Sequence, residues 1–232
     1  MPLPVAFDLN SFLIAAPVLL FSMVAHEYAH GYAALKQGDT TALDLGRLTF
    51  NPAKHIDPFM TVILPISLAV AGLPIFGGAK PVPVNPANYV NYRRGDIIVS
   101  LAGIFTNLCI AAICVPLVIL VGLLGRSAGA IAQPLAILQL MLVQGVALNL
   151  VLALFNLIPL PPLDGSHVFK YLLPIRLAIL YQRLATVGFL LLFALLYFGK
   201  GLLNAWFTPI FIAMDKLYQL IGPYMLPNPF ST

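Results

Sequence analysis

The chain has 232 residues, of which 60% are hydrophobic and only 9% are charged, and its formal net charge is +4. Soluble domains carry about 25% charged residues, so this composition excludes a soluble globular protein and predicts an all-α polytopic membrane protein. The basic residues are scattered without forming a basic block, which excludes a nucleic-acid-binding protein.

The first apolar run extends from about Leu9 to Gln37, and Gly38 is predicted to end the helix. It contains the sequence His-Glu-Tyr-Ala-His at positions 26–30. Positions i and i+4 of a helix share a face, so both imidazoles can point at one metal ion, and the glutamate between them can reach a water on that ion. Ionisable residues are costly in a bilayer, so the pattern predicts a metal site with Glu27 as general base.

The next three stretches differ from one another in composition. Residues 39–57 are polar, and the alternation of Leu48 and Phe50 predicts a short strand or β-hairpin-like stretch near the membrane surface. The segment from Pro58 to Phe76 is apolar but short and broken by Pro and Gly, so we expect it to re-enter the membrane rather than cross it. Residues 77–91 are rich in proline and are predicted to be extended.

Three further spans are predicted in the second half. Asp96 is expected to cap a helix from Ile97 to about Gly125, and Pro134 to start a helix that ends near Asn156. A further span is predicted at 178–198, and 202–221 is a last apolar segment that either crosses or lies in the interface. These elements add up to about five to six membrane segments.

A catalytic zinc usually takes three protein ligands, and the histidine pair supplies two. The candidates for the third are Asp164, His167, His55 and Asp57. Asp164 is favoured because it follows a Pro-rich break at the end of a spanning helix, where irregular backbone is tolerated if it lines a cavity. The alternative is that Asp164 only caps the next helix. His55 and His167 are not expected to be primary ligands, but His167 is near enough to support Asp164.

These two motifs together resemble the site-2 protease family of intramembrane zinc metalloproteases. The family pairs HExxH with Asn-x-x-Pro-x-Pro-x-Leu-Asp-Gly, and residues 26–30 and 156–165 match both patterns in full. The resemblance extends to Gly103, Asn107 and the loop at 80–86. It implies one Zn²⁺ per chain, with His26, His30 and Asp164 as ligands and Glu27 as catalytic base.

The resemblance also implies the reaction. It is the hydrolysis of peptide bonds within or near transmembrane segments, known as regulated intramembrane proteolysis, on a transmembrane substrate that we expect to span the bilayer once. Asn107 and Asn156 become candidate substrate contacts, although their residue type alone favours hydrogen bonds between helices. Many relatives carry PDZ or CBS domains, and we expect neither here. The expected arrangement is a single domain over 1–232, with a catalytic core at about 9–168 and additional membrane segments at about 178–222.

The rival interpretation is a non-proteolytic membrane metal-binding scaffold or a metal-ion transporter. Such a protein would not need Glu27 beside the ligands, and transporters usually show inverted repeats, which this sequence lacks.

The basic residues also predict a topology. If 58–76 re-enters, nine basic residues share one side of the membrane. They are Lys36, Arg47, Lys54, Lys80, Arg93, Arg94, Lys170, Arg176 and Arg183. Because basic loops stay on the cytosolic side, the amino terminus is expected outside, with the zinc nearer the cytosolic face. The lack of targeting signals favours a prokaryotic plasma membrane.

Overall fold

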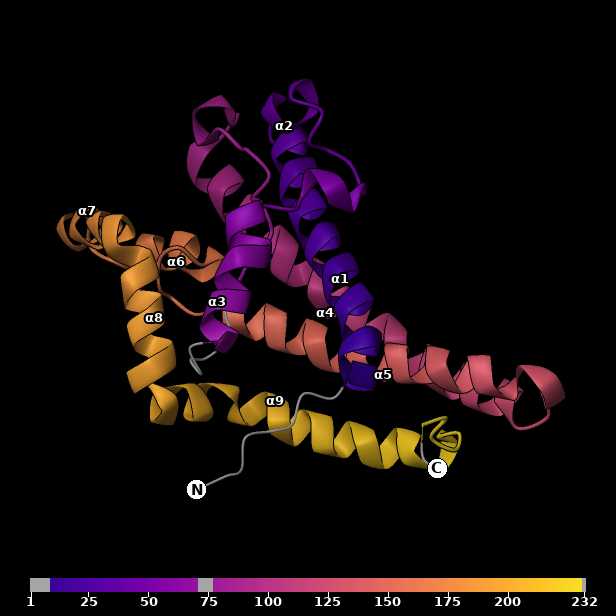
Figure 1. Ribbon diagram of the computed structural model, residues 1–232. Helices are drawn as coiled ribbons and strands as arrows, with labels where there is room; N and C mark the ends of the chain where they lie inside the picture. Colours follow the sequence, from indigo (N-terminus) through magenta and orange to yellow (C-terminus); the bar gives the residue numbers. More distant parts are fainter. Residues whose placement is uncertain (1–8, 71–76, 231–232) are drawn as a thin grey trace.

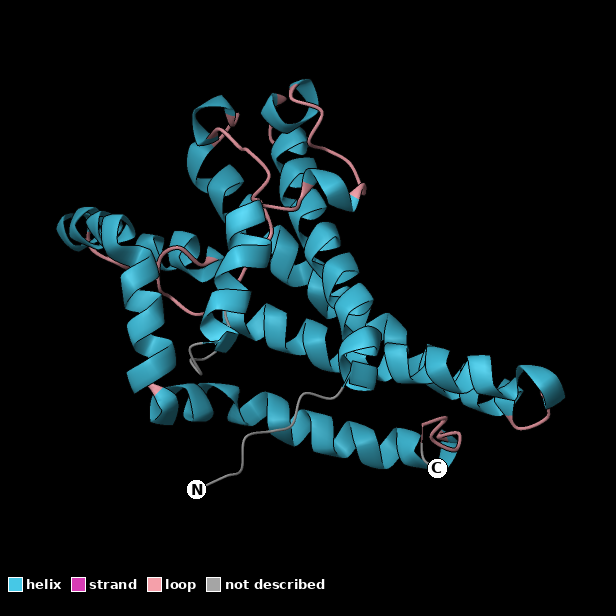
Figure 2. Ribbon diagram, viewed as in Figure 1, coloured by secondary structure: helices cyan, strands magenta, loops and turns pink. Residues whose placement is uncertain are grey.

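The computed structural model describes residues 9–70 and 77–230, in which helices are connected by loops and no strand is present (Figure 2). Three long helices form its centre: α1 (Leu9–Lys36), α4 (Tyr92–Gly125) and α5 (Ala132–Asn156). Helices α4 and α5 pair side by side as a hairpin, and α1 packs against both (Figure 1). The predicted all-α fold is therefore confirmed.

The remaining elements are shorter or lie outside this centre. The other helices are α2 (Thr41–Asp44), α3 (Leu64–Val70), α6 (Asp164–Phe169), α7 (Ile175–Arg183), α8 (Gly188–Phe198) and α9 (Lys200–Ile221). A π-helix at Pro58–Ile63 leads into α3. Turns of 3₁₀ helix lie at Pro52–Lys54, Pro86–Asn88, Gly129–Ile131, Lys170–Leu172, Leu184–Val187 and Gly222–Tyr224.

Four stretches of the described chain are long and apolar enough to cross a membrane. They are Asn10–Lys36, Tyr92–Gly125, Gly129–Asn156 and Ile175–Phe198. Among the described residues the structure thus supports four membrane-spanning helices and does not support the predicted five to six membrane segments. Helix α9 falls short because Lys200, Asp215 and Lys216 interrupt its apolar character. The six π-helical and seven α-helical residues of 58–70 reach about 20 Å, which is less than the hydrocarbon thickness of about 30 Å. Residues 71–76 lie outside the described part, so the re-entrant course stays a prediction.

The first helix ends as predicted. Gly38 has a φ of +106°, which is a left-handed conformation that glycine adopts readily, and the amide of Asp39 donates to the carbonyl of Ala34 at 3.0 Å. The buried Asp39 carboxylate then accepts hydrogen bonds from the Asn85 amide at 2.6 Å and from Asn88 at 2.8 Å. The end of α1 is thereby joined to the extended segment that follows residue 77.

The predicted strand at Leu48 and Phe50 is wrong. The amides of Arg47 and Leu48 donate to the carbonyl of Ala42, so this backbone folds back onto α2 and does not pair as a strand. Phe50 stacks on Tyr28 of α1, with ring centroids 4.2 Å apart. The alternation of apolar residues therefore reflects packing against α1, which a period of two cannot distinguish from a sheet face.

The predicted cap of the long helix is also wrong. Helix α4 begins at Tyr92, and its N-cap is Asn91, whose side chain accepts from the Arg94 amide at 3.0 Å. Asp96 lies one turn inside the helix and is buried. Asparagine is as good an N-cap as aspartate, so the helix starts at the first competent residue and Asp96 is left to other contacts.

The carboxyl-terminal helices enclose the end of α5. Leu192 of α8 packs with Ile158 and Leu163 in a buried cluster. Trp206 of α9 donates to the carbonyl of Leu154 at 3.0 Å. Because α5 ends two residues later, this bond satisfies one of the carbonyls that a helix end leaves without an intrahelical partner.

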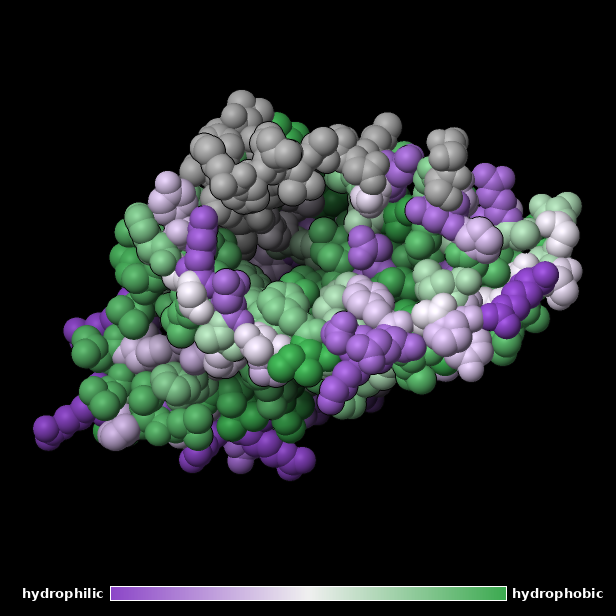
Figure 3. Space-filling model, turned by 90° about the horizontal axis from the view of Figure 1, so that it is seen from below, coloured by the Kyte–Doolittle hydropathy of each residue, from purple (hydrophilic) through white to green (hydrophobic). Residues whose placement is uncertain are grey.

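The surface is largely apolar. Seen from below, broad hydrophobic areas cover the molecule, and long hydrophilic side chains project mainly at its margins (Figure 3). Large hydrophobic side chains are exposed on α4, α8 and α9, among them Phe105, Leu190 and Phe211. Apolar exposure on this scale is incompatible with water and suits a lipid surrounding.

Candidate metal centre

Three side chains from two distant parts of the chain converge on one point. His26 Nε2 and His30 Nε2 are 2.9 Å apart, and the Oδ2 atom of Asp164 lies 3.1 Å and 3.3 Å from them. Within the described residues this is the one group of His, Cys, Asp and Glu side chains arranged to hold a metal ion. The structure thus brings together the three residues that the sequence nominates.

The donor set fits zinc. Zn²⁺ with bonds of about 2.0–2.2 Å separates its tetrahedral ligand atoms by about 3.3–3.5 Å, so these three atoms need to move apart by only a few tenths of an ångström. Burial raises the pKa of the Asp164 carboxyl, but its hydrogen bonds with His26 and His30 outweigh burial and hold that pKa well below its usual range. Asp164 can therefore offer an anionic carboxylate to a metal ion. It is also the first residue of α6, whose N-cap is Leu163, so the capping alternative for Asp164 is wrong.

Helix α4 supports the histidine pair from behind. The carbonyl of Val99 lies 2.7 Å from His30 Nδ1, which fixes the ring so that Nε2 presents its lone pair to the metal position. One turn further, a β-carbon on Gly103 would lie 2.5 Å from His26 Nε2 and 2.6 Å from His30 Nε2. Glycine is required here because any side chain would occupy the space of the two imidazoles.

Glu27 faces an extended segment of the chain. Its Oε2 atom accepts a hydrogen bond from the Val82 amide at 2.8 Å. The same segment is tied down on both sides: the amide of Lys80 donates to the carbonyl of His55 at 2.7 Å, and Arg47 donates to the carbonyl of Lys80 at 3.2 Å. The predicted extended course is confirmed for residues 77–85, after which Pro86–Asn88 forms a turn of 3₁₀ helix.

A cavity of about 330 Å³ opens beside the histidines. His26, Glu27, Asn107 and Asn156 line it together with residues 77–81. Asn107 is fully buried, and neither polar atom of its amide has a hydrogen-bond partner in the described part of the chain. A buried amide without partners loses both water and protein hydrogen bonds, so a ligand group in this cavity would satisfy it.

The remaining candidates for the third ligand do not belong to the group of three converging side chains. His55 is buried, and its Nε2 lies 2.8 Å from the carbonyl of Thr49. Asp57 caps the π-helix by accepting from the amides of Phe59 and Met60. His167 does not join the metal group; its Nδ1 lies 3.4 Å from Asp96.

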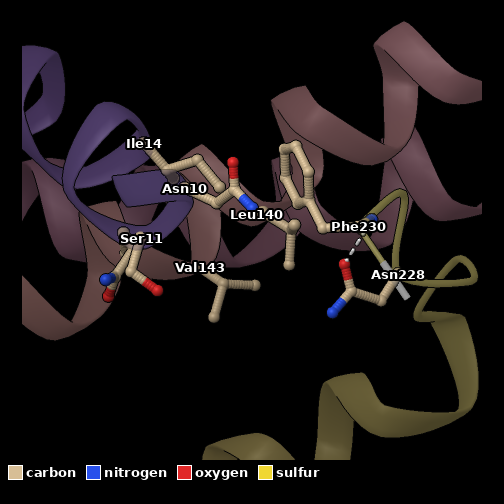
Figure 4. Close-up of a pocket in the computed structure, with 8 residues that line it drawn as sticks. Asn10, Ser11, Ile14, Leu140, Val143, Asn228 and Phe230 are labelled. Carbon is tan, nitrogen blue, oxygen red and sulfur yellow. Dashed lines mark hydrogen bonds between the residues drawn. The ribbon is translucent and has the colours of Figure 1, made fainter. Parts of the chain in front are cut away.

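A second cavity, of about 400 Å³, lies at the other end of α1 (Figure 4). Amide, hydroxyl and apolar side chains line it, including Asn10, Ser11, Leu140 and Phe230. These groups offer hydrogen bonds, but they are poor zinc ligands, so this cavity is not the candidate site.

Sequence reasoning missed the polar contacts that surround the ligands. The carboxylate of Asp96 accepts from Lys170 Nζ at 2.6 Å and from the Tyr171 hydroxyl at 2.8 Å. Both Asp96 and Lys170 are buried. The sequence did contain a signal for this pair: Asp96 and Lys170 are opposite charges that adjoin apolar segments, and a buried charge needs a partner.

The comparisons with known proteins agree with this geometry. Residues 14–199 match the model of peptidase family M50. Over 225 residues the chain is 38% identical to a Bacillus subtilis protein named "Putative zinc metalloprotease YwhC", with 95% of each chain covered. It is 30% identical over 210 residues to a Mycobacterium tuberculosis protein named "Putative zinc metalloprotease Rip2", covering 88% of this chain and 72% of the relative. No solved structure matches the chain significantly.

The chain therefore belongs to peptidase family M50, the site-2 protease family. It is a multi-pass intramembrane zinc metalloprotease, its cofactor is Zn²⁺, and its substrates are membrane proteins in the lipid bilayer.

Proposed function

We propose that His26, His30 and Asp164 hold the zinc ion and that Glu27 is the catalytic base for cleavage of single-span membrane proteins. The observation that carries the proposal is the convergence of the three ligand atoms within 4.8 Å of one another. Glu27 belongs to the same turn of α1 as the histidines and lines the adjoining cavity.

Zinc, when bound, supplies a Lewis acid that lowers the pKa of water and polarises the scissile carbonyl. Glu27 takes the proton from the attacking water and delivers it to the leaving nitrogen. Its Oε2 atom accepts the hydrogen bond from the Val82 amide, and the second carboxylate oxygen, Oε1, can take the proton. Water reaches the site along the polar stretch at 39–57 and the extended segment at 77–85.

The substrate needs an extended course, since its scissile carbonyl is hydrogen-bonded inside a helix. Asn107 and Asn156 are the proposed contacts, and both line the cavity beside His26. Leu48–Asn51 and Lys80–Pro86 are the two candidate segments that could hold an extended substrate as an added strand. The second is favoured because it is extended beside Glu27, whereas Phe50 of the first is stacked on Tyr28. The alternative for residues 80–86 is a rigid connector.

We further propose a cell membrane location in a prokaryote, with the amino terminus outside and the zinc nearer the cytosolic face. The distribution of basic residues supports this, because Lys80, Arg47 and Lys170 all belong to the end of the molecule that carries the metal centre. Residues 9–168 are the proposed catalytic core of a single domain, and 178–222 are its additional segments.

The test is the zinc content per chain, measured in the same samples as cleavage of a substrate with one transmembrane span. We expect one zinc in the wild type and in Glu27→Gln, cleavage in the wild type alone, and weakened zinc binding in Asp164→Ala. His55→Gln is the matched control, because the His55 side chain is buried like the proposed ligands but hydrogen-bonds to the carbonyl of Thr49 and not to the metal group.

Each result has a definite meaning. Absence of zinc from the wild type would overturn the metal site. Full cleavage by Glu27→Gln would overturn the role of the base. Equal zinc loss in His55→Gln and Asp164→Ala would indicate general unfolding and not loss of a ligand.

A further inference from the structure

The third metal ligand stands on a very short helix. Helix α6 has six residues, and a 3₁₀ turn at Lys170–Leu172 continues it. A six-residue helix is not stable by itself, so neighbouring elements have to fix its orientation. The direction of the Asp164 carboxylate therefore depends on what α6 packs against.

One face of this helix carries both the ligand and a set of polar residues. Residues 164, 167 and 171 follow the spacing i, i+3, i+7, which places them in one stripe, with Lys170 beside it. The first of these residues contacts His26 and His30. The others converge on Asp96 of α4. Tyr171 and Lys170 also form cation–π contacts with Arg93 and Tyr92 of the same helix.

Asp96 joins three residues of this stripe. Its Oδ2 atom lies 2.6 Å from Lys170 Nζ and 2.8 Å from the Tyr171 hydroxyl, and its Oδ1 atom lies 3.4 Å from His167 Nδ1. The Asp96 side chain is only 5% exposed, and that of Lys170 only 9%. Shielded from water, these contacts act at a lower dielectric than a surface ion pair.

The same stretch of α4 holds the other two ligands. Val99, one turn after Asp96, orients His30 through its carbonyl, and Gly103, one turn further, leaves the space for both imidazoles. At the start of α6, Gly165 allows a close approach to the backbone of the preceding loop, because a β-carbon there would lie 2.3 Å from the carbonyl oxygen of Leu157.

We propose that Asp96 is a positioning residue which, through Lys170, His167 and Tyr171, sets the rotation of α6 and so aims Asp164 at the metal held by His26 and His30. This inference rests on the proposed metal site. On this proposal, one face of α4 positions all three ligands: Val99 and Gly103 contact the histidines, and Asp96 contacts the helix that carries Asp164.

Zn²⁺ affinity of the purified full-length protein, measured by competition with a chelator, tests the proposal. We expect Asp96→Asn to weaken affinity by about 10–100-fold, as is typical when a group that orients a metal ligand is lost. Tyr171→Phe removes one of the three contacts and should weaken it less. With Co²⁺ in place of zinc, the visible absorption of Asp96→Asn should differ from that of the wild type, because the ligand geometry has changed.

A double variant separates positioning from simple stabilisation. Asp96→Asn with Lys170→Met removes the unpaired buried charge, so thermal stability should recover while zinc affinity stays low. Gln139→Leu is the control: Gln139 of α5 is as buried as Asp96 but bonds to Val118 near the far end of α4, and its loss should leave zinc affinity and the cobalt spectrum unchanged.

Wild-type affinity and spectrum in Asp96→Asn would overturn the inference while leaving the metal site intact. Recovery of affinity together with stability in the double variant would also overturn it, since the pair would then be only a structural ion pair. A wild type that binds no Zn²⁺ would overturn the metal site and this inference with it.

Discussion

At each end of α4 there is a glycine that allows a close approach and a buried polar side chain that bonds to a neighbouring segment, but only one end carries the proposed metal site. At the metal end, Gly103 makes room for two imidazoles, and buried Asp96 holds a neighbouring helix. At the other end, Gly122 makes room for the carbonyl of Tyr224, and buried Gln139 bonds to the carbonyls of Val118 and Tyr224 and to the amide of Leu226.

The difference lies in what remains unsatisfied. Both polar atoms of the Gln139 amide are hydrogen-bonded to backbone: Nε2 donates to two carbonyls, and Oε1 accepts from an amide. This end therefore needs no ligand to satisfy its buried polar side chain. At the metal end three ligand atoms face one another, and the Asn107 amide lacks a partner in the described residues. The comparison shows how a functional end can be recognised: its close packing leaves polar groups that only a ligand satisfies.

The largest effect is expected for Gly103→Ala. The added methyl group would lie 2.5 Å from His26 Nε2, so two of the three ligands have to move, and zinc affinity should fall by at least about 100-fold, at the upper end for loss of ligand support. Gly122→Ala should instead lower thermal stability, because the methyl group meets the backbone of Tyr224, which cannot turn aside. Zinc titration and thermal unfolding of both variants check the contrast.

Equal zinc affinity in folded Gly103→Ala and wild type would contradict the geometry of the metal end. A loss of zinc in folded Gly122→Ala would show that the two ends are not independent.

The second effect is smaller. One variant is expected to change activity but not stability, and the other is expected to change stability but not activity. Asn107→Ala should leave stability nearly unchanged, because neither polar atom of the amide has a partner among the residues that the structure describes, yet it should lower the rate of cleavage. Gln139→Ala removes three hydrogen bonds and should cost about 2–3 kcal/mol of stability without changing the rate per folded molecule. Unchanged cleavage by Asn107→Ala would exclude it as a substrate contact.

The comparison also explains what the sequence can and cannot predict. The metal end is signalled by residue type and spacing, since His26 and His30 share a helix face whatever surrounds them. The predicted β-hairpin at Leu48 was wrong because the apolar alternation there reflects packing on α1. The predicted five to six membrane segments are not supported, because α9 is not uniformly apolar enough and residues 58–70 are not long enough to cross a membrane. The pairing of Asp96 with Lys170 depends on the rotation of a short helix, which sequence periodicity does not give.

The smallest effect is expected when the pH is lowered. It distinguishes the hydrogen bonds to the charged Asp39 carboxylate from those to the uncharged Gln139 amide. Burial raises the pKa of the Asp39 carboxyl, but hydrogen bonds from Asn85, Thr41 and Asn88 hold it below its usual range. A lowered folded pKa contributes stability that is present above the unfolded value of about 3.9 and is lost as the pH falls through the folded value. Acid should therefore loosen residues 85–88 first, whereas the segment held by the uncharged Gln139 should not respond.

Hydrogen exchange at residues 85–88 measures this response. At pH 7, Asp39→Asn should reduce the protection of these amides several-fold, because it replaces hydrogen bonds to a charged acceptor, each about 1.5–3 kcal/mol, by weaker neutral ones. Below the folded pKa of Asp39 the wild type carries the same neutral acceptor, so variant and wild type should become alike. A difference that persists in acid would show that the shape of the side chain, and not its charge, joins α1 to the extended segment.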